Sequence, residues 1–260
     1  MTPPAVLVHR DQDLLAKAAA ARLVTRIVDA QAARGSASVV LTGGGVGTAV
    51  LAALAATGAR DAIDWRRLDV WWGDERFLPT GDPERNETGA RAALLDHVDL
   101  DPARVHPMPA SDGPDGDDAE AAAERYAAEL RAAARPEDHG PVPSFDVLML
   151  GVGPDAHVAS LFPEMPALYD ERPVVAVHGA PKPPPTRLSL TLPSLCAAHE
   201  VWVLASGESK AKAVRLGLSS EAGPVQVPCA GARGRKGTLF LLDRAAAAEL
   251  PPGIERIASP

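Results

Sequence analysis

The sequence has little of what several large classes of protein require. Only two of its 260 residues are cysteine, Cys196 and Cys229, and their spacing matches no disulfide framework, metal motif or redox pair. No apolar run approaches the ~20 residues that a transmembrane helix needs, so a membrane protein is not expected. The N-terminal region also lacks the basic and then apolar segments of an export signal. These absences favour a cytoplasmic protein.

Positive charge is also in the minority. The 26 Lys and Arg residues stand against 34 Asp and Glu residues, which gives a formal net charge of −8 at pH 7. A surface that binds nucleic acid by neutralising phosphates needs an excess of positive charge, so a nucleic-acid partner is not expected. A small anion bound in a locally basic pocket remains compatible with this balance. The composition gives no indication of a protein partner.

The length and the hydrophobic pattern predict the fold class. With 46% hydrophobic residues, the chain can form one large α/β domain over residues 1–260, with or without a small lobe made by its C-terminal strands. Seven or eight short apolar runs are expected to be strands, with helical segments between most of them. This alternation predicts a doubly wound, mostly parallel open sheet flanked by helices. The expected strands are 5–8, 37–41, 68–72, 145–150, 173–177, 187–192, 200–205 and 238–243. The expected helices are 11–33, 49–54, 88–98, 119–134, one beginning near Lys210 and one beginning at Arg244.

Titratable residues follow the clearest of these strands. Residues 145–150 form a nearly unbroken apolar run, and the loop Gly151-Val152-Gly153-Pro154-Asp155-Ala156-His157 comes directly after it. Ligands of open α/β sheets bind at the carboxyl ends of the strands. Histidine titrates near pH 6.5 in model peptides and can therefore accept a proton near neutral pH. Asp155 and His157 are thus candidate catalytic residues, although a lone histidine is more often structural.

A glycine cluster follows the strand 37–41. Gly43, Gly44 and Gly45 lead into the helix predicted around 49–54. Consecutive glycines let backbone N–H groups converge on an anion, and the helix adds its unpaired amides and the positive end of its dipole. The segment matches neither a P-loop nor G-x-G-x-x-G, so a nucleotide is not expected. The alternative is an ordinary tight turn between strand and helix.

Charged residues follow two more strands. Asp74, Glu75 and Arg76 come after 68–72, with Asn86 further along the chain. Lys210 comes after 200–205, in the first turn of a predicted helix. A lysine at a helix start opposes the helix dipole, and this is acceptable where the site must hold an anion. The alternative for Asp74 to Arg76 is a solvated turn.

Five segments, taken in order, resemble the 6-phosphogluconolactonase family. They are the glycine loop, Asp74-Glu75-Arg76, G-x-G-x-D-x-H from Gly151, Arg187-Leu188-Ser189-Leu190-Thr191, and Gly207-Glu208-Ser209-Lys210-Ala211. The resemblance spans nearly the whole chain. It implies that Gly43, Gly44, Gly45 and Lys210 bind a phosphate group. It also implies that Asp74, Arg76 and Asn86 line a sugar-phosphate pocket and that Arg187 reaches the ligand.

The sequence departs from the family pattern at four places. Ala156 stands where glycine is usual, Val158 where threonine is usual, Gly45-Val46 where Ser/Thr-Pro is usual, and Arg85 where serine is usual. If the backbone at Ala156 has a positive φ, the loop is either strained or different in shape. Thr42 or Thr48 would have to supply the hydroxyl that is missing from the glycine loop.

The resemblance implies hydrolysis of 6-phosphoglucono-δ-lactone to 6-phosphogluconate, a step of the oxidative pentose phosphate pathway. His157 is expected to take a proton from the water that attacks C1, and Asp155 to orient the imidazole or the water. Arg76, Arg187 and Lys210 are expected to hold the phosphate and the polar edge of the sugar, and which of them contacts which group stays open. No cofactor and no metal ion are expected, because a lactone carbonyl is already electrophilic.

Two other functions are compatible with the same motifs. Glucosamine-6-phosphate deaminase/isomerase has the same fold and phosphate loop, but it carries Asn-Glu after the histidine, where this sequence continues with Ser160-Leu161-Phe162-Pro163. A non-catalytic sugar-phosphate sensor would keep the basic residues and could dispense with Asp155 and His157. A metal site at these two residues lacks a third ligand in the sequence pattern.

Overall fold

The computed structural model describes residues 3–219, 223–250, 253–254 and 256–258. The strands are β1 (Ala5–His9), β2 (Ala37–Leu41), β3 (Leu68–Trp72), β4 (Asp74–Arg76), β5 (Val105–His106), β6 (Val147–Gly151), β7 (Val174–Val177), β8 (Arg187–Leu190), β9 (Glu200–Ala205), β10 (Gly237–Asp243) and β11 (Arg256–Ala258). The α-helices are α1 (Gln12–Arg34), α2 (Gly44–Ala56), α3 (Asn86–Ala93), α4 (Ala119–Ala133), α5 (Leu192–Leu195), α6 (Ala211–Leu218) and α7 (Pro228–Gly231).

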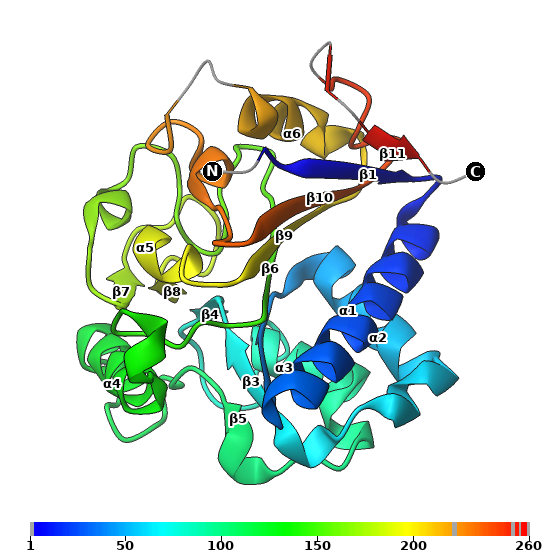
Figure 1. Cartoon of the computed structure of the whole chain (residues 1–260). Helices are drawn as coiled ribbons and strands as arrows, with labels where there is room; N and C mark the ends of the chain where they lie inside the picture. The colour runs from blue at the N-terminus through cyan, green and yellow to red at the C-terminus, as the bar shows by residue number, and fades with distance from the viewer. Residues whose placement is uncertain (1–2, 220–222, 251–252, 255, 259–260) are drawn as a thin grey trace.

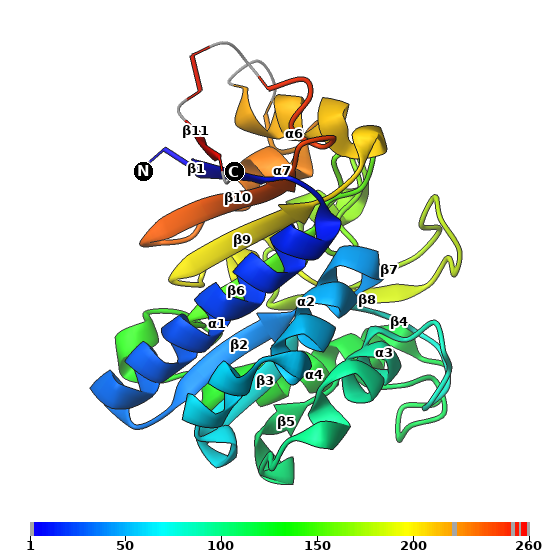
Figure 2. The same cartoon turned by 90° about the vertical axis from the view of Figure 1, so that its right-hand side faces the viewer.

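Eight of these strands form one twisted sheet in the order β11-β1-β10-β9-β6-β2-β3-β5. Every neighbouring pair in it is parallel. Helices α1 and α2 lie on one face, and α4 and α5 lie on the other (Figure 1). Figure 2 shows α1 crossing in front of the central strands. The predicted doubly wound, mostly parallel sheet is confirmed.

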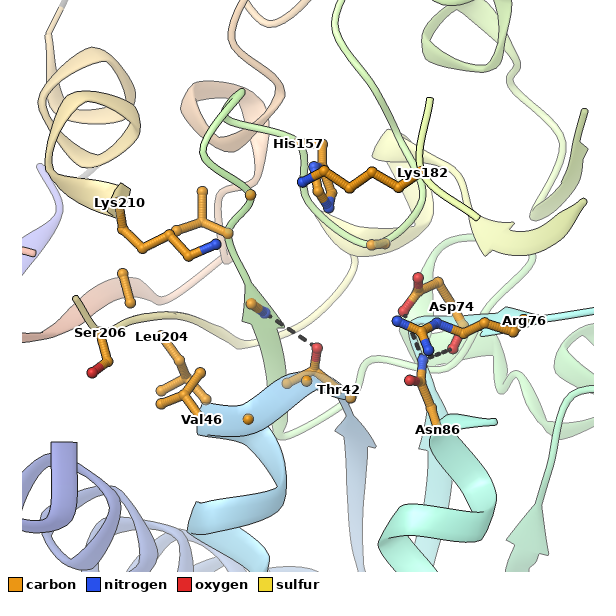
Figure 3. Close-up of a pocket in the computed structure, with 18 of the residues that line it drawn as sticks. Thr42, Val46, Asp74, Arg76, Asn86, His157, Lys182, Leu204, Ser206 and Lys210 are labelled. Atoms are coloured by element: carbon orange, nitrogen blue, oxygen red, sulfur yellow. Dashed lines mark hydrogen bonds between the residues drawn. The ribbon is translucent and has the colours of Figure 1, made fainter. Parts of the chain in front are cut away.

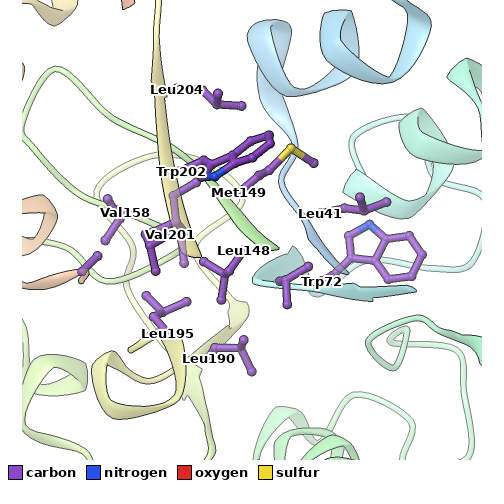
Figure 4. Packing of buried hydrophobic residues seen from close by; sticks show 14 of the residues in the cluster. Leu41, Trp72, Leu148, Met149, Val158, Leu190, Leu195, Val201, Trp202 and Leu204 are labelled. Carbon is purple, nitrogen blue, oxygen red and sulfur yellow. The ribbon is translucent and has the colours of Figure 1, made fainter. Parts of the chain in front are cut away.

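The central strands are apolar on both sides because helices cover both faces of the sheet. Met149 on β6 is in register with Trp202 on β9, and the two project to the same side. Their neighbours Leu148 and Val201 project to the opposite side (Figure 4), as the two-residue period of a strand requires. No helix within the described ranges has both the length and the apolar character to cross a membrane.

A second, three-stranded antiparallel sheet has the order β4-β8-β7. It places Arg76 of β4 in register with Arg187 of β8, at a distance of more than a hundred residues in sequence. The chain passes from the large sheet to the small one at Gly73, which separates β3 from β4. The C-terminal strands β10 and β11 belong to the large sheet.

Three expectations about the elements need correction. The predicted helix from Arg244 is wrong, because residues 244–249 form only turns. Asp243 accepts a hydrogen bond from the backbone N–H of Ala246, which closes a single turn, and Pro251-Pro252 soon follow in the sequence. The structure describes eleven strands rather than seven or eight, since β4, β5 and β11 are too short to give a hydrophobic pattern. The helix expected at 88–98 begins earlier and is α3, followed by a 3-10 turn at Leu95–His97.

Candidate active site

A pocket of about 360 Å³ opens at the carboxyl ends of β2, β3, β6 and β9, which are neighbours in the large sheet. Nine of the ten residues predicted for the site line it: Gly43, Gly44, Gly45, Asp74, Arg76, Asn86, His157, Arg187 and Lys210. The tenth, Asp155, is exposed and does not line the pocket itself, but it contacts His157. The structure thus brings together the segments that the sequence places at separate strand ends.

His157 and Asp155 form a hydrogen-bonded pair. The distance from His157 Nδ1 to Asp155 Oδ1 is 2.6 Å. An ionised carboxylate only accepts hydrogen bonds, so Nδ1 carries the proton and Nε2 is left as the acceptor. Burial alone would raise the pKa of Asp155, but the hydrogen bond and charge of His157 and the charge of Lys182 lower it to about 2. The imidazole also packs against Phe162, with 4.5 Å between the ring centroids.

The loop backbone explains why glycine precedes this pair. A Cβ at Gly153 would lie 2.0 Å from His157 Nδ1 and 2.3 Å from Asp155 Oδ1. The Gly153 N–H donates to the His157 carbonyl at 3.0 Å, and the Ala156 N–H donates to the Gly153 carbonyl at 2.9 Å. Ala156 has φ 69°, so the conformation that glycine would favour is kept by a residue with a Cβ.

Replacing Ala156 by glycine should change the free energy of unfolding by less than about 1 kcal/mol. A left-handed backbone costs an L-residue ~1–2 kcal/mol, which the glycine would recover. The extra freedom of glycine in the unfolded chain costs ~0.5–1 kcal/mol, and the lost methyl group, which is buried here, costs ~0.8 kcal/mol. Urea unfolding of the two proteins checks the balance. A stabilisation of more than ~2 kcal/mol would show that the loop carries more strain than these magnitudes allow.

The N-terminus of α2 forms one wall of the pocket. Its cap residue is Gly43, no side chain caps it, and its first turn has no acidic residue. The first amides of a helix have no partner within the helix, so those of Gly44 and Gly45 are available to an anion. The Thr42 hydroxyl lines the same wall and accepts a hydrogen bond from the Gly151 N–H at 3.2 Å. Of the two threonines considered, Thr42 is therefore the one at the pocket.

Lys210 faces this helix end across the pocket (Figure 3). It caps α6, which follows β9 and a glycine-containing turn. Burial lowers the pKa of Lys210, and the nearby positive charge of Lys182 acts in the same direction, while Asp155 opposes it. Two cationic groups and a helix N-terminus thus line one pocket, which is an environment that suits a phosphate group.

Residues of β4 and α3 form the opposite wall. Asn86 Nδ2 donates to Asp74 Oδ1 at 3.2 Å and to the Asp74 carbonyl at 2.9 Å. Asp74 is buried, and its Oδ2 accepts a hydrogen bond from the Ser160 hydroxyl at 2.7 Å. Arg76 Nη1 donates to the Glu84 carbonyl at 2.6 Å. Its Nε is buried and has no hydrogen-bond partner among the described residues, and Arg76 lines the pocket.

Sequence reasoning missed Lys182, which lines the pocket with its ammonium 3.9 Å from Asp155 Oδ1. Lys182 lies in the proline-rich connection between β7 and β8, where no motif distinguishes it. The Arg187 guanidinium holds this connection by donating to the carbonyls of Lys182, Pro183 and Pro184, each at 3.1 Å. Gln12 and Ser206 also line the pocket and were not predicted. Gln12 and Ser206 come together at the pocket because α1 packs against the sheet, and no local sequence pattern predicts this packing.

Comparison with known proteins agrees with this geometry. The model of the family glucosamine-6-phosphate isomerases/6-phosphogluconolactonase matches residues 10–241. The chain belongs to this family. The 6-phosphogluconolactonase of Streptomyces coelicolor is 68% identical to it over 249 residues, which cover 95% of each chain. The 6-phosphogluconolactonase of Mycobacterium tuberculosis is 52% identical over 242 residues, which cover 93% of this chain and 96% of the relative.

Solved structures of both branches of the family have this fold. The 6-phosphogluconolactonase of Trypanosoma brucei superposes with a TM-score of 0.82 at 28% identity, covering 96% of this chain and all of the other. A monomeric glucosamine-6-phosphate deaminase superposes with a TM-score of 0.76 at 20% identity, covering 94% of this chain and 99% of the other. At that identity the likeness shows the fold alone. The likeness to the deaminase therefore does not bear on the choice between the two activities.

Proposed function

We propose that the protein hydrolyses 6-phosphoglucono-δ-lactone to 6-phosphogluconate in the oxidative pentose phosphate pathway. The observation that carries the proposal is the hydrogen-bonded pair of His157 and Asp155 in the same pocket as Lys210 and a helix N-terminus that no side chain caps. The helix N-terminus and Lys210 suit a phosphate group, and the pair of His157 and Asp155 suits a proton transfer. The high identity to curated lactonases supports the same activity.

The phosphate is proposed to bind at the start of α2. There the amides of Gly44 and Gly45 and the ammonium of Lys210 converge, and each contributes a charge-assisted or dipole-assisted hydrogen bond. Arg187 would contribute through Nη1, since its Nε and Nη2 are occupied by carbonyls. Anchoring the phosphate fixes the position of C1 relative to His157, which removes much of the entropic cost of the reaction.

The reaction is proposed to begin with water attacking C1 while His157 Nε2 takes a proton from it. Asp155 holds the imidazole in the tautomer that leaves Nε2 free and stabilises the positive charge that forms. The carbonyl oxygen then carries negative charge, and Arg76 is the cation that we place opposite it because it lines the pocket on the wall across from Lys210. When the bond from C1 to the ring oxygen breaks, the proton on Nε2 passes to that oxygen.

The deaminase alternative is disfavoured by the residues after His157. Deamination with ring opening uses a carboxylate there in the related enzymes, and this chain has Ser160-Leu161-Phe162-Pro163, which contains none. A non-catalytic sensor would not need the short hydrogen bond between His157 and Asp155, so the sensor alternative is also disfavoured.

Activity can be measured on freshly generated 6-phosphoglucono-δ-lactone. The purified protein should accelerate its loss well above spontaneous hydrolysis, with the same rate in the presence of EDTA. Glucosamine 6-phosphate, tested in parallel, should yield neither fructose 6-phosphate nor ammonia. Lactonase activity that EDTA abolishes and zinc restores would overturn the proposed mechanism, and turnover of glucosamine 6-phosphate would reverse the choice between the two activities.

Replacing Lys210 by alanine should raise KM for the phosphorylated lactone by about 10- to 100-fold, because a charge-assisted hydrogen bond contributes ~1.5–3 kcal/mol. KM for unphosphorylated glucono-δ-lactone should change little. Lys212, which is exposed in the first turn of α6, provides the matched control, and its replacement by alanine should leave both values unchanged. An equal change for both substrates in the Lys210 variant would mean that this lysine does not contact the phosphate.

A further inference from the structure

Glu75 lies between two residues of the proposed site, Asp74 and Arg76, but its own side chain points away from the pocket into the protein. It is fully buried, with 0% of its surface exposed. Its Oε1 accepts hydrogen bonds from the backbone N–H of Asn86 at 2.6 Å and of Arg76 at 2.8 Å, and its Oε2 accepts from the N–H of Glu87 at 2.9 Å. One carboxylate therefore joins β4 to the start of α3.

The two amides on α3 belong to its first turn, which has no other side-chain cap: its cap residue, Arg85, makes no capping hydrogen bond. Glu75, which lies on β4, thus caps the N-terminus of α3. A negative charge at a helix N-terminus is favourable, and the capped amides include that of Asn86, whose side chain forms a wall of the pocket.

Arg85 supplies the countercharge. It is 2% exposed, and Nη2 lies 3.9 Å from Glu75 Oε2 and 3.1 Å from Glu87 Oε2. The same guanidinium donates to the carbonyls of Met108 at 2.8 Å and Leu78 at 3.2 Å. A buried carboxylate without a nearby cation would tend to take up a proton, because burial disfavours the charged form. Arg85 opposes that tendency at Glu75.

We propose that Glu75 is a positioning residue for the active site, which fixes Arg76 and Asn86 relative to the reacting carbon, and that Arg85 keeps it ionised. This inference rests on the proposed function, since Arg76 and Asn86 are placed there against the sugar. Neither Glu75 nor Arg85 lines the pocket. Their effect is transmitted through three backbone amides and does not involve the phosphate anchors at α2 and Lys210.

The charged and titratable groups around Glu75 come from four elements and one connection. They are Asp74 and Arg76 on β4, Arg85 before α3, Glu87 in α3, Arg187 on β8 and Tyr126 on α4. Burial raises the pKa of Glu75 to about 7, although the charge of Arg85 and the three N–H groups act in the opposite direction. As the pH falls, protonation weakens the acceptors for Arg76 and Asn86, so kcat should fall with it. Removing the charge of Arg85 should move this loss to higher pH.

Four variants test the proposal against wild type. In Glu75→Ala all three amides lose their acceptor, and kcat should fall by about 10- to 100-fold, as expected for a displaced catalytic geometry. Glu75→Gln resembles the protonated acid, so its kcat at neutral pH should fall, though less than in the alanine variant, and its profile should lack the acid limb that protonation of Glu75 gives. Arg85→Met should shift the acid limb of kcat upward by at least about half a pH unit. The double variant Glu75→Gln with Arg85→Met has no buried charge left unpaired and should lose that shift.

Inorganic phosphate, a competitive ligand of the proposed anion site, separates positioning from general damage. Its inhibition constant should stay within about threefold of wild type in all four variants, because the phosphate anchors are on other elements. Arg125→Met is the matched control, since Arg125 forms an exposed pair with Asp115 and its replacement makes the same change of charge and length. It should change neither kcat nor the pH profile.

The proposal is overturned if Glu75→Gln and Arg85→Met keep the wild-type kcat and acid limb, or if phosphate affinity falls in parallel with kcat. If Glu75→Ala does not fold, the glutamine and double variants decide the matter. A wild-type protein without lactonase activity would instead contradict the proposed function, so the two failures are distinguishable.

Discussion

His157→Asn should lower kcat for 6-phosphoglucono-δ-lactone by at least about a hundredfold. Asparagine is polar and of similar reach, but it cannot accept a proton near neutral pH, so the variant loses the base and little else. General acid–base catalysis typically contributes ~10²–10⁴-fold to the rate, or ~3–5.5 kcal/mol.

Binding of the product provides the control for this variant. 6-Phosphogluconate should bind within a few-fold of wild type, because the amides of α2 and Lys210 are untouched. A fall of kcat with unchanged product binding indicates an interaction that is made in the transition state. A variant within about fivefold of wild type would show that His157 is not the base. Asp74, buried across the pocket with an oxygen on the Ser160 hydroxyl, would then be the next candidate.

The large sheet could be predicted from the sequence because its strands are short, apolar and bounded by turn residues. The ranges expected for β2, β3 and β9 agree with the structure at both ends. The parallel arrangement follows from the alternation of strands and helices, and it implies that motifs at strand ends meet at one edge. The same rule predicts a common site for Gly43, Asp74, His157 and Lys210, and all four line the pocket.

The remainder of the site depends on contacts between distant segments. Lys182 reaches the pocket because Arg187 holds three successive carbonyls of its loop, and such side chain to backbone bonds leave no pattern in the sequence. The small antiparallel sheet was missed for a related reason. Its strand β4 has three charged residues and no hydrophobic period, so only its pairing with β8 makes it a strand. The prediction of a helix from Arg244 was wrong because a high alanine content is not sufficient for a helix in a short segment that two prolines follow.

Gly153→Ala should reduce kcat about as strongly as loss of the histidine itself, without unfolding the protein. The backbone of Gly153 is not left-handed, so alanine can adopt its conformation and the effect comes from the added methyl group alone. That methyl group would lie 2.0 Å from His157 Nδ1 and 2.3 Å from Asp155 Oδ1, well inside van der Waals contact. Both side chains must move, and the 2.6 Å hydrogen bond between them cannot persist.

Gly58→Ala serves as the matched control for this last prediction, because a Cβ there meets no atom within 4 Å. It should leave kcat unchanged. The thermal midpoint of Gly153→Ala should stay within a few degrees of wild type, since the loop lies at the edge of the sheet and the exposed Asp155 side chain can turn toward solvent. Product binding should again be retained, as in the histidine variant. A Gly153→Ala protein with near wild-type kcat would mean that catalysis does not require the pair of His157 and Asp155 in the geometry described, and the role of Asp155 would have to be abandoned first.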